Sequence, residues 1–260
     1  MKFAIVKGKK QEALISGERG TCIYCGAETV AHCGQHKVNH WQHKNLPECD
    51  TWYEPETEWH RYWKNQFPES FQEVVKFDPV TGEKHIADIH HPTKDVTIEF
   101  QHSNISSNEI QSRELFYKNL VWVLDYTEKA ENIIIYTDLL MTYEKEIWPQ
   151  WVKKENKKIL HLKETQNSDI YNQYVLNRQD GIQLEQIKKE LVELSKRGGY
   201  KLIQWKRKPK AWGDAKCPIF LDLGKGMIIQ VLKNIITWDG LLVRIHSKEQ
   251  FISNFLNCAQ

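Results

Sequence analysis

A short segment crowded with cysteine and histidine is the feature that most constrains how this 260-residue chain can fold. Cys22-Ile23-Tyr24-Cys25 is followed by His40-Trp41-Gln42-His43, which together form a C-x2-C … H-x2-H array. Two thiolates on a tight turn and two imidazoles complete the tetrahedral coordination of a zinc ion. Because four protein ligands leave no open position, we expect a structural Zn2+ site at Cys22, Cys25, His40 and His43 that supplies folding energy to this small segment.

Other residues of the same segment compete for places in this site, namely His32, Cys33, His36 and Cys49. A disulfide framework is another interpretation of clustered cysteines. The amino terminus has no signal-peptide pattern, so we expect a cytoplasmic protein with reduced thiols, for which metal binding is the better explanation. The remaining alternative is that these cysteines and histidines are unrelated core and surface residues.

The chain after this segment alternates between helix and strand patterns. We expect a helix from about residue 54, strands at 71–77, 85–90 and 96–101, a helix at 106–118, and strands at 121–125 and 132–136. This order predicts a mixed α/β (α+β) core. A helix at 183–197 and four later strands predict a C-terminal α/β region. We therefore divide the chain into an N-terminal hairpin and zinc module (1–51), the core (52–165) and the C-terminal region (166–260), with no predicted membrane span.

Two acidic residues stand on neighbouring predicted strands. If the turn between these strands centres on Thr93-Lys94, antiparallel pairing places Asp88 opposite Glu99 on one side of the sheet. Like charges so placed repel each other, and a bound divalent cation such as Mg2+ or Mn2+ relieves the repulsion and can activate a water molecule. Gln101 points to the same face as Glu99. The alternative is a solvated strand face, because hairpins with two acids are common.

Several short motifs occur in an order that resembles a known family. They are Glu58-Trp59-His60, Trp63-Lys64, His85-Ile86-Ala87-Asp88, Ile98-Glu99-Phe100-Gln101-His102-Ser103, Arg113, Tyr117 and Trp122-Val123-Leu124-Asp125. This array is similar to the competence-protein CoiA-like family, which is assigned to the PD-(D/E)XK nuclease superfamily. The resemblance covers roughly residues 22–125. It implies a restriction-endonuclease-like core in which Asp88 and Glu99 hold Mg2+ or Mn2+, and Gln101 stands where a lysine is usual.

The resemblance also implies accessory roles near the carboxylates. Glu58 would add a carboxylate close to the metal, and His60 and Lys64, one helical turn apart, would contact phosphate. Arg113 would bind phosphate as well. For each there is a plainer alternative: Glu58 favours the helix dipole, Lys64 is solvated, and Arg113 forms a surface salt bridge. His102 and Ser103 would close the site or contact the nucleic-acid backbone.

A basic stretch marks the C-terminal region. Residues 196–210 contain seven basic side chains and no acidic one, although the whole chain has a formal net charge of only +2. Clustered cations bind phosphates by counterion release, so we expect Lys206, Arg207 and Lys208 to contact nucleic acid. A loop that is merely solvated is the alternative.

These features together predict a metal-dependent deoxyribonuclease that acts on DNA during recombination, uptake or processing. Its expected cofactors are catalytic Mg2+ or Mn2+ and structural Zn2+. Two other functions remain open. One is a zinc-containing DNA-binding protein without catalysis, and the other is an RNA-cleaving nuclease on the same core.

Overall fold

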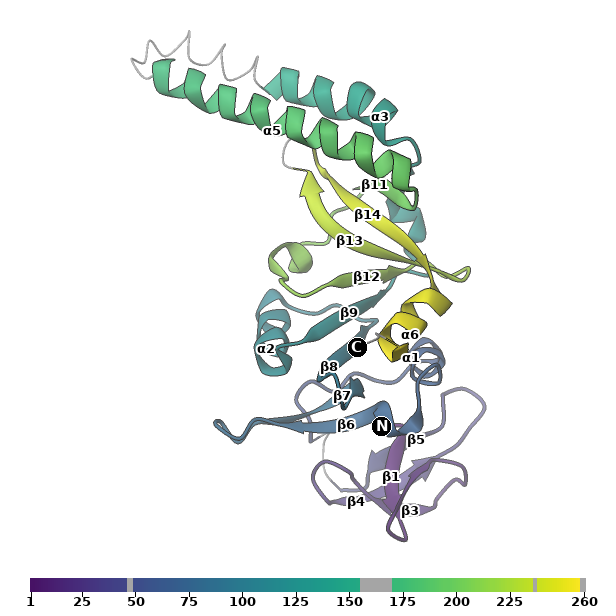
Figure 1. The fold of residues 1–260 in the computed structure, drawn as a ribbon. Helices are drawn as coiled ribbons and strands as arrows, with labels where there is room; N and C mark the ends of the chain where they lie inside the picture. Colours follow the sequence, from purple (N-terminus) through teal and green to yellow (C-terminus); the bar gives the residue numbers. More distant parts are fainter. Residues whose placement is uncertain (46–48, 155–169, 236–237, 258–260) are drawn as a thin grey trace. The chain divides into compact units, whose positions relative to one another are not determined.

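The computed structural model describes residues 1–45, 49–154, 170–235 and 238–257, with only the backbone described along 170–183. The chain forms two compact units (Figure 1). The first comprises Met1–Tyr126, Pro209–Asp222 and Glu249–Gln260, and the second comprises Thr127–Lys208 and Leu223–Lys248. The boundary predicted near residue 165 lies outside the described residues. Each unit is discontinuous in sequence, whereas the sequence predicted three consecutive parts.

A five-stranded antiparallel sheet forms the N-terminal part of the first unit, in the order β2-β1-β3-β4-β5. Its strands are β1 (Phe3–Val6), β2 (Lys9–Glu12), β3 (Arg19–Thr21), β4 (Glu28–His32) and β5 (His40–His43). The predicted opening hairpin is confirmed, with Phe3 opposite Glu12. The indole of Trp41 is fully buried in a small core with Ala4 and Ala31. Because this core contains so few apolar side chains, we expect the five-stranded sheet to need a further source of stability.

The rest of the first unit is built on a second set of strands in the order β12-β9-β8-β7-β6. These are β6 (Gln72–Phe77), β7 (Lys84–His91), β8 (Val96–Gln101), β9 (Leu120–Asp125) and β12 (Ile219–Asp222). The strands β6, β7 and β8 form an antiparallel meander, whereas β9 is parallel to both β8 and β12. The strands β6, β7, β8 and β9 follow one another along the chain in the predicted order.

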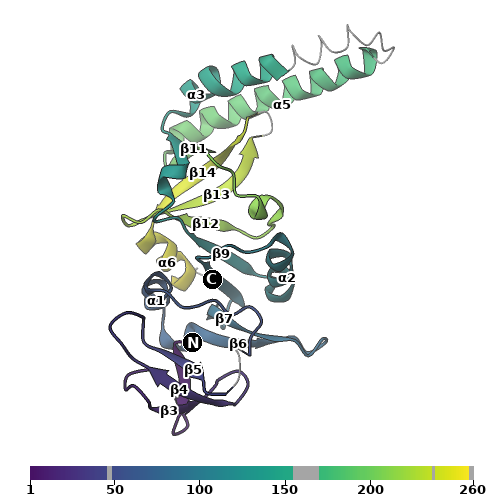
Figure 2. The same cartoon turned by 180° about the vertical axis from the view of Figure 1, so that it is seen from behind.

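Helices cover both faces of these strands. Figures 1 and 2 show α1 and α6 on one face and α2 on the other. Their bounds are α1 (Glu58–Lys64), α2 (Ser107–Tyr117) and α6 (Lys248–Asn257), with the short helices η1 (Glu69–Phe71) and η4 (Ala211–Asp214) between them. The ring of Trp63 stacks on Phe100 at 5.6 Å and meets Phe251 edge-on at 5.8 Å. These contacts join α1, β8 and α6 into one core.

The first helix is shorter than predicted, and its start has a local cause. Thr57 caps α1, because its Oγ1 accepts a hydrogen bond from the backbone N–H of His60. Residues 53–56, which precede Thr57, are neither helix nor strand. The acidic, proline-containing stretch 54–58 thus belongs mostly to a segment that precedes the helix, which changes where its carboxylates lie.

The second unit is an antiparallel sheet in the order β10-β11-β14-β13, covered by helices. Its elements are η2 (Ala130–Asn132), β10 (Ile133–Tyr136), α3 (Leu139–Thr142), the π-helical turn η3 (Tyr143–Ile147), α5 (Ile170–Arg197), β11 (Tyr200–Trp205), β13 (Met227–Ile235) and β14 (Gly240–Ser247). Leu184, Leu191 and Leu202 lie in its buried core. Among the described residues, none of the helices combines the length and the apolar character that crossing a bilayer requires.

Candidate functional site

Four metal-binding side chains converge in the N-terminal part of the first unit. The ligand atoms of Cys22, Cys25, His43 and Cys49 all lie within 4.8 Å of one another. Sγ of Cys22 is 3.8 Å from Sγ of Cys49, and Sγ of Cys25 is 3.3 Å from Nε2 of His43. Zinc–sulfur bonds of about 2.3 Å and zinc–nitrogen bonds of about 2.0 Å give tetrahedral edges of roughly 3.5–3.8 Å. This Cys3His cluster, which we call the metal centre, can therefore hold a metal ion such as zinc.

The metal centre differs from the predicted ligand set in one member. His40 lies on β5 three residues before His43, and side chains that are three apart in a strand point to opposite faces. Its ring stacks on His32 at 5.5 Å, and its Nδ1 is 2.9 Å from the carbonyl oxygen of Val38. Cys49 takes the place predicted for His40. An H-x2-H pair can place both rings on one metal ion in a turn or a helix, but not in a regular strand.

A tight turn prepares the two paired thiols. Gly26 adopts a positive φ of 77°, and its N–H donates to the carbonyl of Cys22. The N–H of Tyr24 donates to Sγ of Cys22 at 3.4 Å. Burial would raise the pKa of the Cys25 thiol, but a bond from the backbone N–H of Ala27 and the neighbouring ligands outweigh it and lower that pKa to about 7. The turn thus favours the thiolate form at Cys25, whereas burial raises the pKa of the Cys22 thiol.

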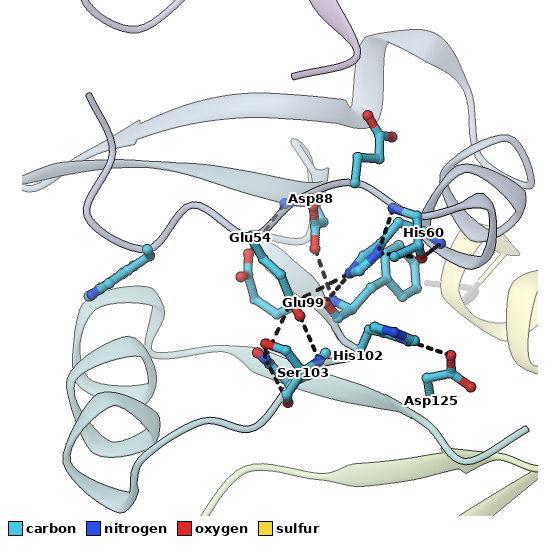
Figure 3. A network of polar contacts seen from close by, with 12 residues as sticks. Glu54, His60, Asp88, Glu99, His102, Ser103 and Asp125 are labelled. Atoms are coloured by element: carbon cyan, nitrogen blue, oxygen red, sulfur yellow. Dashed lines mark hydrogen bonds and ion pairs between the residues drawn. The ribbon is translucent and has the colours of Figure 1, made fainter. Parts of the chain in front are cut away.

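The second cluster lies where β7 and β8 separate. Ile89 pairs with Ile98, His90 with Thr97 and His91 with Val96, so the predicted register is confirmed. The next pair in this register is Asp88 and Glu99, and there the carboxylates replace the backbone ladder. The N–H of Asp88 donates to Oε1 of Glu99 at 3.2 Å, and the N–H of Phe100 donates to Oδ2 of Asp88 at 3.0 Å (Figure 3). The hairpin therefore opens at the two predicted acids.

A third carboxylate completes a row across three strands. The pairs Gln72–Ile89 and Val74–Ala87 place Glu73 opposite Asp88. Glu73 has a positive φ of 44°, and its carboxylate accepts hydrogen bonds from the backbone N–H groups of Lys2 and Phe3. Burial would raise its pKa, but the charge of Lys64 and these donors lower the pKa of Glu73 to about 2. It is therefore ionised, and it ties the first strand to this site.

A buried lysine stands among these carboxylates. Nζ of Lys64 lies 2.9 Å from Oδ1 of Asp88, 3.1 Å from Oε1 of Glu73 and 3.7 Å from Oε1 of Glu56. Burial by itself would lower the pKa of Lys64, but the charges of Asp88, Glu56 and Glu73 outweigh it and raise this pKa well above the ordinary value. Lys64 is therefore a buried, charged member of the site, which contradicts the alternative of a solvated lysine, and its contact with phosphate stays a prediction.

Glu99 is the most perturbed acid of the row. Its side chain is buried, and Oε2 accepts a hydrogen bond from Nη1 of Arg113 at 3.0 Å. Burial and the negative charge of Asp88 raise the pKa of Glu99 to about 8, although Arg113 acts to lower it. Arg113 is itself buried and also pairs with Glu109. It thus holds a carboxylate of the site instead of lying free to bind phosphate.

These side chains line one cavity of about 60 Å3. One water molecule needs roughly 10–15 Å3 of such space, so the cavity has room for a small hydrated ion. Asp88 and Glu99 offer the oxygen donors that Mg2+ and Mn2+ prefer, and Oε1 of Glu56 is buried with no hydrogen-bond donor among the described residues. The donor set therefore fits a hard divalent cation. We call Asp88, Glu99, Glu73 and Lys64 the carboxylate site.

The other residues predicted for this site have different surroundings. Glu58 is exposed and does not line the cavity, because it is the first residue of α1. Glu54, from the segment before the helix, lines the cavity instead. His60 also lines it, with Nε2 3.1 Å from the carbonyl of Phe100 and Nδ1 2.9 Å from Oγ1 of Thr57. Both ring nitrogens of His60 therefore have protein partners.

Gln101 does not line the cavity and is bonded to the segment that precedes α1. Its Nε2 donates to Oε2 of Glu54 at 3.1 Å and to the carbonyl of Ser103 at 3.2 Å. Burial would raise the pKa of Glu54, but hydrogen bonds from His60 and Ser103 lower it to about 2. His102, whose side chain is 44% exposed, has Nδ1 2.7 Å from Oδ2 of Asp125 (Figure 3). The sequence analysis missed Glu54, Glu56 and Glu73, although the alternation of acids at 54 and 56 was a visible signal.

The predicted nucleic-acid contacts of the basic stretch lie in the second unit. Lys206, Arg207 and Lys208 are exposed after the end of β11. The backbone of the first two is held by Asn132, and Nζ of Lys208 is 3.4 Å from Oδ1 of Asp239. These contacts fix the loop and leave its cationic side chains at the surface.

Comparisons with models of protein families, with curated proteins and with solved structures find no match to this chain. The resemblance of its motifs to the CoiA-like family therefore has no independent support. Function has to be argued from the two clusters described above.

Proposed function

We propose that this chain is a divalent-cation-dependent nuclease that hydrolyses phosphodiester bonds of DNA in the cytoplasm, with Asp88 and Glu99 as the ligands of Mg2+ or Mn2+. One observation carries the proposal. The β7–β8 hairpin opens where two acidic side chains meet in register, inside a cavity that also holds a buried lysine. The order helix, three strands, helix, strand supports it, because that order agrees with a PD-(D/E)XK core.

Lys64 would supply the lysine side chain that is usual at the position of Gln101. Its ammonium reaches Asp88 from α1, whereas Gln101 is engaged with Glu54. Because its pKa is raised, Lys64 would keep its proton and act as a fixed positive charge for the phosphate, not as a base. A divalent cation held by Asp88 and Glu99 would lower the pKa of a bound water molecule and offset the negative charge of the phosphodiester.

A second candidate function is favoured by a specific observation. Each carboxylate of the pair already has a cationic partner, Lys64 for Asp88 and Arg113 for Glu99. A buried network of paired charges can persist as a structural feature without any metal. The chain would then be a zinc-containing DNA-binding protein that does not cleave.

Cleavage assays separate these functions. Labelled single-stranded, duplex and branched DNA, and RNA of the same sequence, are incubated with Mg2+, Mn2+ or neither. We expect cation-dependent cleavage of DNA that Asp88→Asn and Glu99→Gln each abolish, while Asp95→Asn, which alters an exposed carboxylate at the turn of the same hairpin, retains it. Cleavage that survives Asp88→Asn would refute the assignment. Cleavage of RNA alone would change the substrate, and DNA binding without cleavage would favour the second candidate.

A further inference from the structure

The segment that begins at Cys49 connects the metal centre to the carboxylate site. We call residues 49–56 the strap. Residues 49–52 form bends and a turn in which the N–H of Tyr53 donates to the carbonyl of Asp50, and residues 53–56 have no regular secondary structure. The even-numbered side chains from Asp50 to Glu56 are buried or half-buried, whereas the odd-numbered ones from Thr51 to Pro55 are exposed. One side of the strap therefore faces the protein. The inward side chains are the ones that reach the carboxylate site.

Asp50 holds the strand that carries Asp88. Its Oδ1 is 2.7 Å from Nδ1 of His85, and its Oδ2 accepts a hydrogen bond from the N–H of Ile86 at 2.8 Å. Ile86 precedes Asp88 by two residues on β7. The residue next to a ligand of the metal centre is therefore bonded directly to the strand of the carboxylate pair.

Trp52 reaches the other carboxylate through an arginine. Its ring stacks on His85, with the ring centres 3.3 Å apart and the planes at 10°. Its carbonyl accepts a hydrogen bond from Nη2 of Arg113 at 2.9 Å, and Nη1 of the same guanidinium holds Glu99 at 3.0 Å. The direction of Arg113, and so of Glu99, depends on where the strap lies.

The last two inward side chains repeat this pattern. Glu54 accepts hydrogen bonds from the N–H of Ser103 and from Nε2 of Gln101, at the end of β8. Glu56 pairs with Nη2 of Arg61 at 2.9 Å and lies 3.7 Å from Nζ of Lys64. The strap thus contacts the strand or the cationic partner of both Asp88 and Glu99.

We propose that the strap positions the carboxylate pair and thereby couples the two sites, so that metal bound at Cys22, Cys25, His43 and Cys49 strengthens cation binding at Asp88 and Glu99. One end of the strap would be fixed by a metal–sulfur bond at Cys49, and the other end is fixed where Thr57 caps α1. Loss of the metal frees the first end, and with it Asp50 and Trp52. This inference rests on the proposed function only in taking the pair as a cation site.

The coupling has a measurable size. Two coupled sites change each other's affinity by a factor of about 5–150. We therefore expect the full-length protein to bind Mn2+ at least about fivefold more weakly after its zinc is removed. Free Mn2+ is measured by electron paramagnetic resonance, and zinc by metal analysis of the same samples.

A matched pair of variants tests the strap without removing zinc. Asp50→Asn weakens the contact to His85 and Ile86, whereas Glu83→Gln alters an exposed carboxylate that lies 2.9 Å from the other nitrogen of the same histidine. With zinc near one per chain in both, we expect Asp50→Asn to bind Mn2+ at least about fivefold more weakly than the parent. Glu83→Gln should bind Mn2+ as the parent does.

Each outcome decides the question. Equal Mn2+ affinity with and without zinc, or parent-like affinity in zinc-loaded Asp50→Asn, would overturn the coupling while leaving the nuclease proposal intact. If the zinc-free chain unfolds, the zinc-loaded variants decide alone. If the parent binds no Mn2+, the nuclease proposal and the effect on cation affinity both fail, and the positioning of the pair by the strap is then tested alone by deuterium uptake of residues 86–101. Uptake that is unchanged by zinc removal would overturn it.

Discussion

Replacing Glu99 by glutamine should make the protein more stable when no divalent cation is present, and increasingly so as the pH rises. The pKa of Glu99 is raised to about 8 from an ordinary value of 4.5, by burial and by the charge of Asp88. The folded carboxyl keeps its proton to a higher pH than the unfolded one. Ionising this carboxyl in the folded protein lowers the free energy of unfolding. The loss is absent below about pH 4.5, grows between pH 4.5 and pH 8, and is complete above about pH 8.

The size of the effect follows from this interval. Each unit of pKa difference between the folded and unfolded carboxyl corresponds to about 1.4 kcal/mol, so the upper limit of the stability gain is roughly 5 kcal/mol. Glutamine keeps the shape of the side chain, but it leaves the buried guanidinium of Arg113 with Glu109 as its carboxylate partner, which offsets part of the gain. We expect a net gain of about 1–3 kcal/mol near pH 7.5 and close to none near pH 5.

Urea unfolding at these two pH values, followed by tryptophan fluorescence in buffer without Mg2+ or Mn2+, measures the gain. Glu109→Gln is the matched control, because it changes the other carboxylate that pairs with Arg113, and it should show no gain that grows with pH. A Glu99→Gln protein that is less stable than the parent at both pH values would refute the reasoning. Glu99 would then be a structural partner of Arg113.

Two further predictions concern the metal centre and the carboxylate site, and a third concerns the basic loop. Cys49→Ser should lose zinc and His40→Ala should keep about one zinc per chain by metal analysis; the reverse result would restore the ligand set first predicted. Lys64→Gln should lower the cleavage rate at least about a hundredfold and destabilise the fold by about 3 kcal/mol, whereas Gln101→Ala should cost less in both assays; equal losses would contradict the role of Lys64. Alanine at all of 206–208 should weaken DNA binding and lower the slope of log affinity against log salt by up to about 3. An unchanged slope would remove that loop from the binding surface.

The order of the core elements and the pairing of Asp88 with Glu99 were predictable from sequence. The side-chain period of a strand is two, and the turn at residues 92–95 sets the register, so local rules were sufficient. The helix predicted at 106–118 also depends on local signals, and Ser106 caps it. Features that depend on three or four neighbouring residues were therefore found.

Features that depend on long-range approach were not predictable in this way. Glu73 joins the site because the backbone of the first strand reaches it from 70 and 71 residues away in sequence. Lys64 became part of the site because α1 turns its side chain inward, which the helical spacing of His60 and Lys64 does not determine. The choice of Cys49 over His40 required knowing that residues 40–43 form a strand.

The discontinuity of the first unit has a consequence for folding during synthesis. The indole N–H groups of Trp59 and Trp63 share Oδ2 of Asp222, at 2.9 and 2.8 Å, across 163 and 159 residues of sequence. While residues 127–208 are being synthesised, those buried donors have no acceptor from β12, and an unpaired buried donor costs about 1–3 kcal/mol. The nascent first unit must therefore wait for its last segments, and a gene fragment that stops at Tyr126 should yield an unstable product.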